Sequence, residues 1–524
     1  MTDDDGQFVI PALPEAEYEV WVRGYGLVDS DRTDAAPGAT LELVAEPAAD
    51  AVEAARIYPA SYWLSLLEPP GGSAAWVGHF NLGCQLCHQV GSALTRFQDR
   101  ELFDAGLKKA SFMHVTADGL GRADLLESLT DWTSRIRDGE TPEAPPRPQG
   151  IERNLVITQW AWGDGDAYVH DEIATDKRDP TLYPNGPIYG VDIGNDRIVV
   201  LDPLTHTAGE YPTPTLDGFD TPWCVQTYKP AGADEAFAAG LGSLGCPIEP
   251  GITPNEGKYP NPANPHNPMF DDAGRVWITT QVRREWAEDT PSFCRDAPGI
   301  ANSTHHRQLG WFDTRTGEYQ LIDTCYGTHH LQFDADGVLW TSGDTRVIGW
   351  FDPAKYDPAR PETLAESQGF AEVMVDTDGD GAADTPVPGF NYGIIPNPVD
   401  GSVWTGQPSG FPGSARDDRG RLIRFDPANG TFETYVPPLP GGGPRGVDVD
   451  TNGIIWTALG GSGHLGRFDR SKCGQTWGAG DQCEEGWTLY RSPGPKMRTG
   501  DAPEDEASAD FHYYLFVDQF NTLG

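Results

Sequence analysis

Short apolar stretches that alternate with polar residues, separated by tight turns, repeat along the chain after residue 151. Four segments align with one another: 266–279, 329–342, 392–406 and 445–458. Each reads as a strand, a tight turn and a second strand that carries one tryptophan. The pattern therefore predicts a repeated β-hairpin.

Each hairpin is followed by a third strand that ends in Phe-Asp, at 310–313, 349–352, 423–426 and 466–469, and then by a fourth strand. Four short antiparallel strands per repeat are typical of a propeller blade. A further repeat without the tryptophan begins at Tyr189. At about 40 to 60 residues per repeat, residues 151–524 predict a mainly β domain, a six- or seven-bladed β-propeller.

The pattern upstream of the propeller is helical. Leu125, Leu126, Leu129 and Trp132 recur at the spacing of one helix face. They close a small helical domain over 49–139, and a Pro-rich linker follows at 140–150.

Residues 1–48 read as strands and turns, which predicts a β-sandwich fragment. We expect the chain to begin partway through that module and to stop in mid-strand at its other end.

Composition supports a strand-rich protein and restricts its partners. The 62 glycines and 45 prolines interrupt the chain too often for long helices to dominate. The formal net charge is −42, from 79 acidic and 37 basic residues, which disfavours nucleic acid as a partner and would steer a basic protein towards the surface. A solvated acidic surface with no specific partner is the alternative. No apolar run is long enough for a membrane span.

The motif with the most specific chemistry is the Cys-x-x-Cys-His sequence formed by Cys84, Cys87 and His88. Two thiols at this spacing can bind both vinyl groups of a haem, and the following histidine can ligate its iron. Zinc would need a second ligand pair that the sequence does not offer. A redox dithiol is the other alternative. We expect covalent haem c.

The second axial ligand of the iron is expected in the helical stretch that follows the motif. Met113 is the prediction, with His114 or an open site as alternatives.

The other six cysteines predict disulfides, because haem attachment of this type implies an oxidising compartment. By proximity we pair Cys224 with Cys246, Cys294 with Cys325 and Cys473 with Cys483, although the sequence does not determine connectivity. We expect a periplasmic or secreted bacterial protein.

A set of polar residues recurs at the start of the predicted inner strands. The set is Tyr189, His266, His329, Tyr392 and Arg445, with His512 at the next expected place. Inner strands line the channel of a propeller, so these side chains are expected to converge there as a binding or catalytic site. Strand alternation should turn one of each neighbouring pair, such as His329 and His330, into the blade. The alternative is a polar rim whose histidines bond only to turn carbonyls.

An acidic segment between two repeats suggests a metal loop. Asp376, Asp378, Asp380 and Asp384 stand at positions 1, 3, 5 and 9, with Gly381 at position 6, as in loops that wrap around Ca²⁺. Val387 replaces the usual bidentate glutamate at position 12. A solvated acidic hairpin is the alternative.

Three parts of the chain resemble known protein families. The repeat is similar to the propellers of the streptogramin (virginiamycin B) lyase family over most of 151–524. In that family a rim histidine, a nearby carboxylate and bound magnesium open a cyclic ester by elimination. His266 and His329 match the rim histidine, and no glutamate stands at a corresponding rim position. Residues 80–137 resemble a small c-type cytochrome, and the first residues resemble a carboxypeptidase regulatory-like sandwich.

Three functions remain open on the sequence. In the first, the propeller binds a small-molecule substrate or a partner on its axis and the haem passes electrons, as a haem-dependent oxidoreductase or a relay to an electron-transfer protein. In the second, a rim histidine acts as the base of a C–O lyase or hydrolase. In the third, the chain is a non-enzymatic electron-transfer or scaffold component of a larger assembly.

Overall fold

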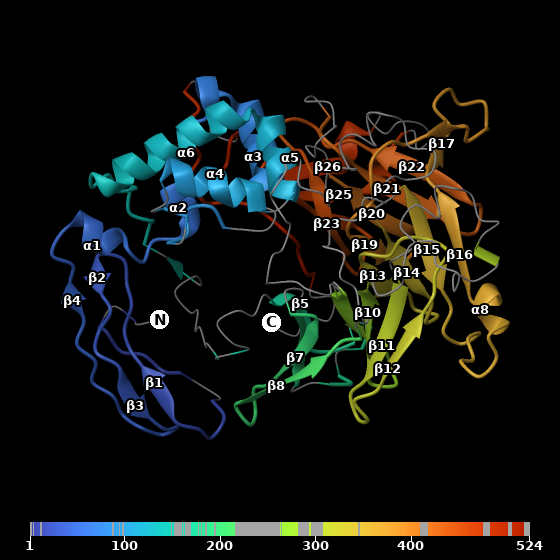
Figure 1. Cartoon of the computed structure of the whole chain (residues 1–524), viewed down its shortest axis with the longest axis horizontal. Helices are drawn as coiled ribbons and strands as arrows, with labels where there is room; N and C mark the ends of the chain where they lie inside the picture. The colour runs from blue at the N-terminus through green and yellow to red at the C-terminus, as the bar shows by residue number, and fades with distance from the viewer. Residues whose placement is uncertain are drawn as a thin grey trace.

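The computed structural model gives the chain a small N-terminal β module, a helical domain and a set of four-stranded sheets (Figure 1). The residues that it describes are 3, 5–10, 13–85, 89–93, 95–96, 99–109, 111–147, 149–150, 160, 162, 169–176, 178–179, 181–183, 186–192, 195–214, 263, 265–280, 293–294, 308–343, 346–408, 418–474, 483–500, 503 and 506–517.

The N-terminal module consists of two separate two-stranded antiparallel sheets. One pairs β1 (Tyr18–Val20) with β3 (Thr33–Ala35), and the other pairs β2 (Leu27–Val28) with β4 (Glu46–Pro47). The Tyr18 hydroxyl lies 3.0 Å from Nε2 of His206, so this module contacts the turn at the outer edge of the first four-stranded sheet.

The helical domain has a single apolar core. Leu125, Leu129 and Trp132 point into that core, as the helix-face pattern predicts, and pack with Val77 and Phe80. Its elements are α1 (Ala51–Ala55), α2 (Ala60–Leu64), η1 (Pro70–Gly72), α3 (Ala74–Cys84), α4 (Arg100–Lys109), α5 (Ser111–Leu120) and α6 (Arg122–Arg137).

The rest of the described chain contains five four-stranded antiparallel sheets, each formed by four strands in succession. The strands are, sheet by sheet, β5 (Val169–Ile173), β6 (Ile188–Asp192), β7 (Arg197–Asp202) and β8 (Thr207–Pro212); β9 (His266–Phe270), β10 (Arg275–Thr280), β11 (Gln308–Asp313) and β12 (Tyr319–Ile322); β13 (Leu331–Phe333), β14 (Leu339–Ser342), β15 (Val347–Phe351) and β16 (Gln368–Glu372); β19 (Ile394–Pro396), β20 (Val403–Gln407), β21 (Arg421–Asp426) and β22 (Thr431–Tyr435); β23 (Pro444–Val449), β24 (Ile455–Leu459), β25 (His464–Phe468) and β26 (Trp487–Arg491). Smaller elements are α8 (Thr363–Glu366), the hairpin β17 (Met374–Val375) and β18 (Thr385–Pro386), η5 (Arg470–Lys472) and η6 (Glu484–Gly486).

These sheets have the arrangement of propeller blades. The edge strands β5, β9, β13, β19 and β23 contact one another in that order, and apolar clusters fill the space between successive sheets. The prediction of a mainly β fold is confirmed. The expected count of six or seven blades extends into parts of the chain outside the described residues and stays a prediction.

A hydrogen bond explains why the repeat has its aspartate and tryptophan. The Trp277 indole donates to Asp271 at 2.8 Å, and the Trp340 indole donates to Asp334 at 2.7 Å. Each aspartate also accepts backbone N–H groups of its own hairpin. The motif therefore ties the turn of a hairpin to its second strand.

The helical domain packs directly on the last described sheet. Helix α3 approaches that sheet so closely that a Cβ added at Gly443 would lie 3.0 Å from Leu82. Beyond β26, Met497, Ala507 and Ala509 belong to the core of the helical domain. The helices and the sheets therefore share a buried interface.

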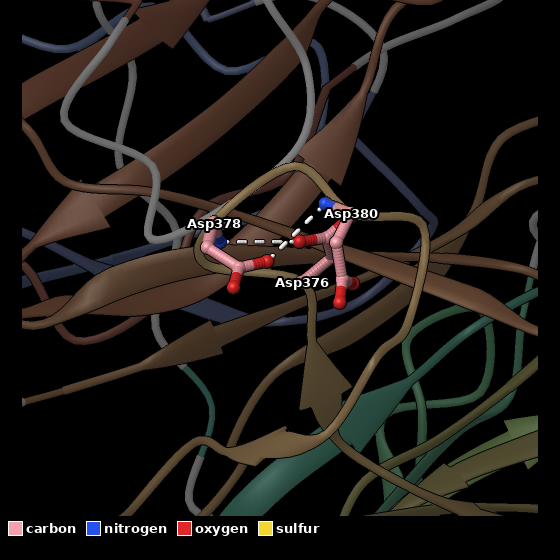
Figure 2. A group of neighbouring side chains, drawn as sticks. All are labelled: Asp376, Asp378 and Asp380. Carbon is pink, nitrogen blue, oxygen red and sulfur yellow. Dashed lines mark hydrogen bonds between the residues drawn. The ribbon is translucent and has the colours of Figure 1, made fainter.

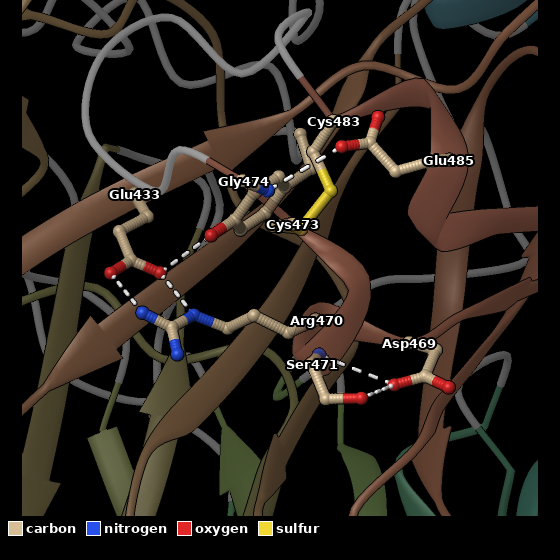
Figure 3. Close-up of a disulfide and its surroundings, with 9 residues drawn as sticks. Glu433, Asp469, Arg470, Ser471, Cys473, Gly474, Cys483 and Glu485 are labelled. Carbon is tan, nitrogen blue, oxygen red and sulfur yellow. Dashed lines mark hydrogen bonds and ion pairs between the residues drawn. A yellow bond between two sulfur atoms is a disulfide. The ribbon is translucent and has the colours of Figure 1, made fainter.

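Two of the three expected disulfides are present, Cys294–Cys325 and Cys473–Cys483. Figure 3 shows the second, next to the ion pair of Arg470 with Glu433. The third expected pair, Cys224 and Cys246, lies outside the described residues. The two confirmed bridges fit an exported protein.

In the part of the chain that the structure describes, no helix combines the length and apolarity needed to cross a bilayer.

Candidate functional site

Four of the five predicted rim residues come together where the inner strands meet. The ring centroids of His266 and His329 are 4.7 Å apart, and those of His329 and Tyr392 are 5.1 Å apart. Arg445 Nη2 donates to the Tyr392 hydroxyl at 2.6 Å. We call the group the axial cluster; its members are His266, His329, His330, Tyr392, Arg445, Tyr513 and Tyr514.

Tyr189 does not join the axial cluster, so its expected place at the start of an inner strand is wrong. It lies in β6, the second strand of its sheet, because β5 forms the inner edge. Its ring packs against Phe270 and Phe312 in the apolar layer between two sheets. Burial raises the pKa of Tyr189, which suits a core phenol rather than a reacting one.

Arg445 is the most buried charged member of the axial cluster. Its side chain is 1% exposed, and its guanidinium lies 3.5 Å from the ring centroid of Tyr513 and 4.2 Å from that of Tyr392. Cation–π attraction therefore holds its charge between two phenol rings.

The two phenols form a short hydrogen-bonded chain with Arg445. The hydroxyl oxygens of Tyr392 and Tyr513 are 2.8 Å apart. Burial raises the pKa of Tyr392 well above its usual value, and the positive charge of Arg445 opposes this shift only in part. Burial raises the pKa of Tyr513 as well. Both phenols therefore remain protonated at neutral pH.

Both histidines of the His329–His330 pair belong to the cluster, which differs from the strand alternation that we expected. Their rings stack at 4.9 Å with 11° between the planes, and His330 also stacks on Tyr514. The difference arises because the pair precedes β13, where the alternation of a strand does not apply.

A carboxylate that the sequence did not reveal lies beside the cluster. Asp171, in the inner strand β5, accepts the backbone N–H of Asn267 at 3.0 Å. Asn267 in turn accepts the Leu331 N–H at 2.6 Å, so three inner edges are joined. The Asp171 charge also contributes to the raised pKa of Tyr392.

Tyr513 and Tyr514 are the other members that sequence reasoning missed. They lie in the segment after β26, directly after His512, which we had placed by register. Gly446 makes room for them, because a Cβ there would lie 2.7 Å from the Tyr514 ring. His512 itself is held by the Ser492 hydroxyl rather than by the cluster.

The described part of the haem motif lies at the end of a helix that faces α5. Cys84 is the last residue of α3, is partly buried and packs on the helical core. A Cβ on its neighbour Gly83 would lie 2.4 Å from Thr116 of α5. Met113 is half-buried one turn before Thr116 on the same helix.

The position of Thr116 tests whether this region fits a prosthetic group. The Thr116 hydroxyl is buried without a hydrogen-bond partner among the described residues, and it lies beside the Cys84 end of α3. A buried hydroxyl without a protein partner beside Cys84 is compatible with a prosthetic group held at that end of α3. Cys87 and His88, and the side chain of His114, lie outside the described residues.

Three of the four predicted calcium ligands converge. Asp376, Asp378 and Asp380 each place a carboxylate oxygen within 4.8 Å of the others (Figure 2). Backbone N–H groups of Gly379 and Gly381 bind Asp376 and help to lower its pKa. Asp384 is outside this group and interacts with Thr385.

No protein-family model and no curated protein matches the chain. Solved structures do match. A streptogramin B lyase is 15% identical with a TM-score of 0.34, over 60% of this chain and 70% of that one. Virginiamycin B lyase from Staphylococcus aureus is 13% identical with a TM-score of 0.33, over 62% and 74%.

A gluconolactonase from Xanthomonas campestris is 13% identical with a TM-score of 0.30, over 60% of this chain and 75% of that one. The structural neighbours are thus lyase-like and gluconolactonase-like propeller proteins. Their similarity is too low to transfer an activity.

Proposed function

We propose that this chain is an exported c-type haem protein in which the axial cluster binds a substrate or partner and the haem exchanges electrons with it. Cys84 and Cys87 would hold the haem, His88 would be its first axial ligand and Met113 its second. When bound, the haem would supply one-electron transfer. The loop with Asp376, Asp378 and Asp380 would bind Ca²⁺ as a structural ion.

The observation that supports the proposal is the contact of α3 with the chain segment that leads to the axial cluster. Asn81 of α3 donates to the Ser508 carbonyl at 3.0 Å, and Leu82 packs against the turn at Gly461. The same segment that receives Asn81 continues to Tyr513 at the axis. Ser508, which α3 contacts, is therefore only about five residues of chain before Tyr513 of the axial cluster.

The remaining contacts of this segment hold the helical domain in one orientation. The Arg498 N–H donates to the Leu67 carbonyl at 3.1 Å, and the Arg498 guanidinium pairs with Glu68 and Glu140. Glu140 also pairs with Arg135 of α6. This network holds α6 and the start of the linker against the propeller segment, which supports a constant spacing between the helical domain and the axis.

The charge of the chain indicates the kind of electron partner. With 79 acidic and 37 basic residues, the surface attracts a basic protein and repels an anion. Stopped-flow oxidation of the reduced full-length holoprotein tests this, with a basic cytochrome c as one acceptor and ferricyanide as the other.

The rate with the basic acceptor is expected to fall at least about tenfold between low and high salt, and the rate with ferricyanide to rise. Equal salt dependence for the two acceptors, or no electron transfer to either, would contradict the proposal.

A second candidate, a lyase or hydrolase with a rim histidine as base, is favoured by one observation. Asp171 supplies a carboxylate at the inner edge, one hydrogen bond from the residue after His266. His88→Ala separates the two candidates once a substrate is in hand. Turnover that survives this change supports the lyase, and turnover lost with the haem supports the electron-transfer proposal.

A further inference from the structure

We infer that the axial cluster binds the carboxylate of a small organic acid, with Arg445 as the residue that contacts it. This inference deepens the proposed function, because it rests on the axis being the place where a substrate binds. It assigns a chemical class to that substrate.

The donors of Arg445 are the first reason. A guanidinium has five N–H donors. In Arg445, Nη2 donates to the Tyr392 hydroxyl at 2.6 Å, while Nε and Nη1 are buried without a hydrogen-bond partner in the described part of the chain. A buried cation with open donors is unfavourable until an acceptor reaches it. An anionic oxygen would satisfy both the donors and the charge.

Two other arginines with little exposure show what Arg445 lacks. Arg424 is similarly buried, and it pairs with Asp400 at 3.1 Å and with Glu433 at 3.6 Å. Arg197 pairs with Asp192 at 2.8 Å. Among the described residues, no carboxylate pairs with Arg445 in this way. We therefore expect the carboxylate of a ligand to pair with Arg445, in place of the protein carboxylate that pairs with the other two arginines.

The surroundings favour a carboxylate over a phosphate. The planar carboxylate matches the planar guanidinium between the two tyrosine rings. A phosphate dianion would bring two charges to one arginine, with the Asp171 carboxylate nearby. Tyr514, which is 39% exposed, offers aromatic surface for the rest of the acid.

Isothermal titration calorimetry on the full-length protein tests the inference, with benzoate as the probe and neutral benzamide as its isostere. The unaltered protein is expected to bind benzoate at least about tenfold more tightly than benzamide or inorganic phosphate, which is about 1.4 kcal/mol. Arg445→Gln is expected to remove this preference, and Arg445→Lys to retain part of it because the charge remains.

Arg424→Gln is the matched control, since it alters a similarly buried arginine away from the axis, and the benzoate affinity of this variant is expected to be unchanged. Near-ultraviolet circular dichroism checks that each variant is folded. Equal affinity for benzoate and benzamide in the unaltered protein would overturn the inference, as would a folded Arg445→Gln protein with unchanged preference. Tighter binding of phosphate than of benzoate would overturn the choice of carboxylate.

The experiment also separates this inference from the proposed electron transfer. The Cys84→Ala, Cys87→Ala double variant cannot hold haem c and is expected to keep its benzoate preference. A coloured protein that exchanges electrons but does not prefer benzoate would overturn the carboxylate site alone. A colourless protein that prefers benzoate would overturn the electron-transfer proposal alone.

Discussion

Asp334 ties a hairpin of the third described sheet to its tryptophan. It accepts the Trp340 indole at 2.7 Å and the backbone N–H groups of Asp336 and Val338, both at 2.9 Å. Asp334→Ala leaves the largely buried indole and two turn N–H groups without this acceptor, so we expect a loss of about 1–3 kcal/mol in the free energy of unfolding. Urea denaturation followed by tryptophan fluorescence measures it.

Asp336→Ala is the control for that change, because Asp336 is exposed in the same turn and is expected to shift stability by about 0.5 kcal/mol or less. Equal effects of the two substitutions would show that the indole bond does not stabilise the hairpin.

His512 gives stability a pH dependence. Burial lowers the pKa of His512 in the folded protein, although the nearby Asp510 charge opposes the shift. As the pH falls, the unfolded chain, with a histidine pKa of about 6.5, therefore binds this proton at a higher pH than the folded protein does. Stability is expected to fall as the pH drops below about 6.5 towards the lowered folded pKa. In the His512→Gln variant, thermal unfolding should show a weaker dependence of stability on pH in this range. An unchanged dependence would contradict the role of His512.

At the residue scale, the sequence predicted the site in part. His266, His329, Tyr392 and Arg445 converge because each stands at the same distance from a hairpin whose geometry is fixed by the repeat. The prediction for Tyr189 was wrong because its repeat lacks the tryptophan that marks the second strand, and Tyr189 lies in that second strand, β6. Asp171 lies in a strand with no such hairpin signature, so no periodic pattern marks it.

The acidic loop between β17 and β18 is an element whose role can be measured directly. Three of its carboxylates converge, and Asp384 does not join them. Calcium is expected to raise the thermal unfolding midpoint, because binding to the folded state alone stabilises it, and a chelator should reverse the effect. Asp380→Asn should weaken calcium binding at least about tenfold.

Asp384→Asn is the matched control and should weaken calcium binding much less. If the two variants bind calcium equally well, or if calcium leaves the midpoint of the unaltered protein unchanged, the loop is a solvated hairpin.

At the element scale, the sequence predicted the strands and helices well where a repeat or a helix face was long enough. The core face of α6 follows the spacing of Leu125, Leu129 and Trp132. The N-terminal module differs more from its prediction, a β-sandwich fragment. Its strands are only two or three residues long, and their pairing depends on turns rather than on periodicity.

For the whole molecule, the finding that the sequence could not predict is the docking of the helical domain. Met497 and Ala509 complete a core built from helices more than 350 residues earlier in the chain. Pattern reasoning is local, so it does not detect contacts between such distant segments. This docking brings Cys84 and the axial cluster into one arrangement, and the electron-transfer proposal depends on it.

The central claim is that haem c is bound covalently at Cys84 and Cys87, and an absorption spectrum tests it most directly. The full-length protein, produced in a host that attaches haem c and purified under denaturing conditions, should keep its colour and show a sharp c-type α-band after reduction with dithionite. The Cys84→Ala, Cys87→Ala variant should lose both. A colourless protein, or one whose colour is lost on denaturation, would contradict the account.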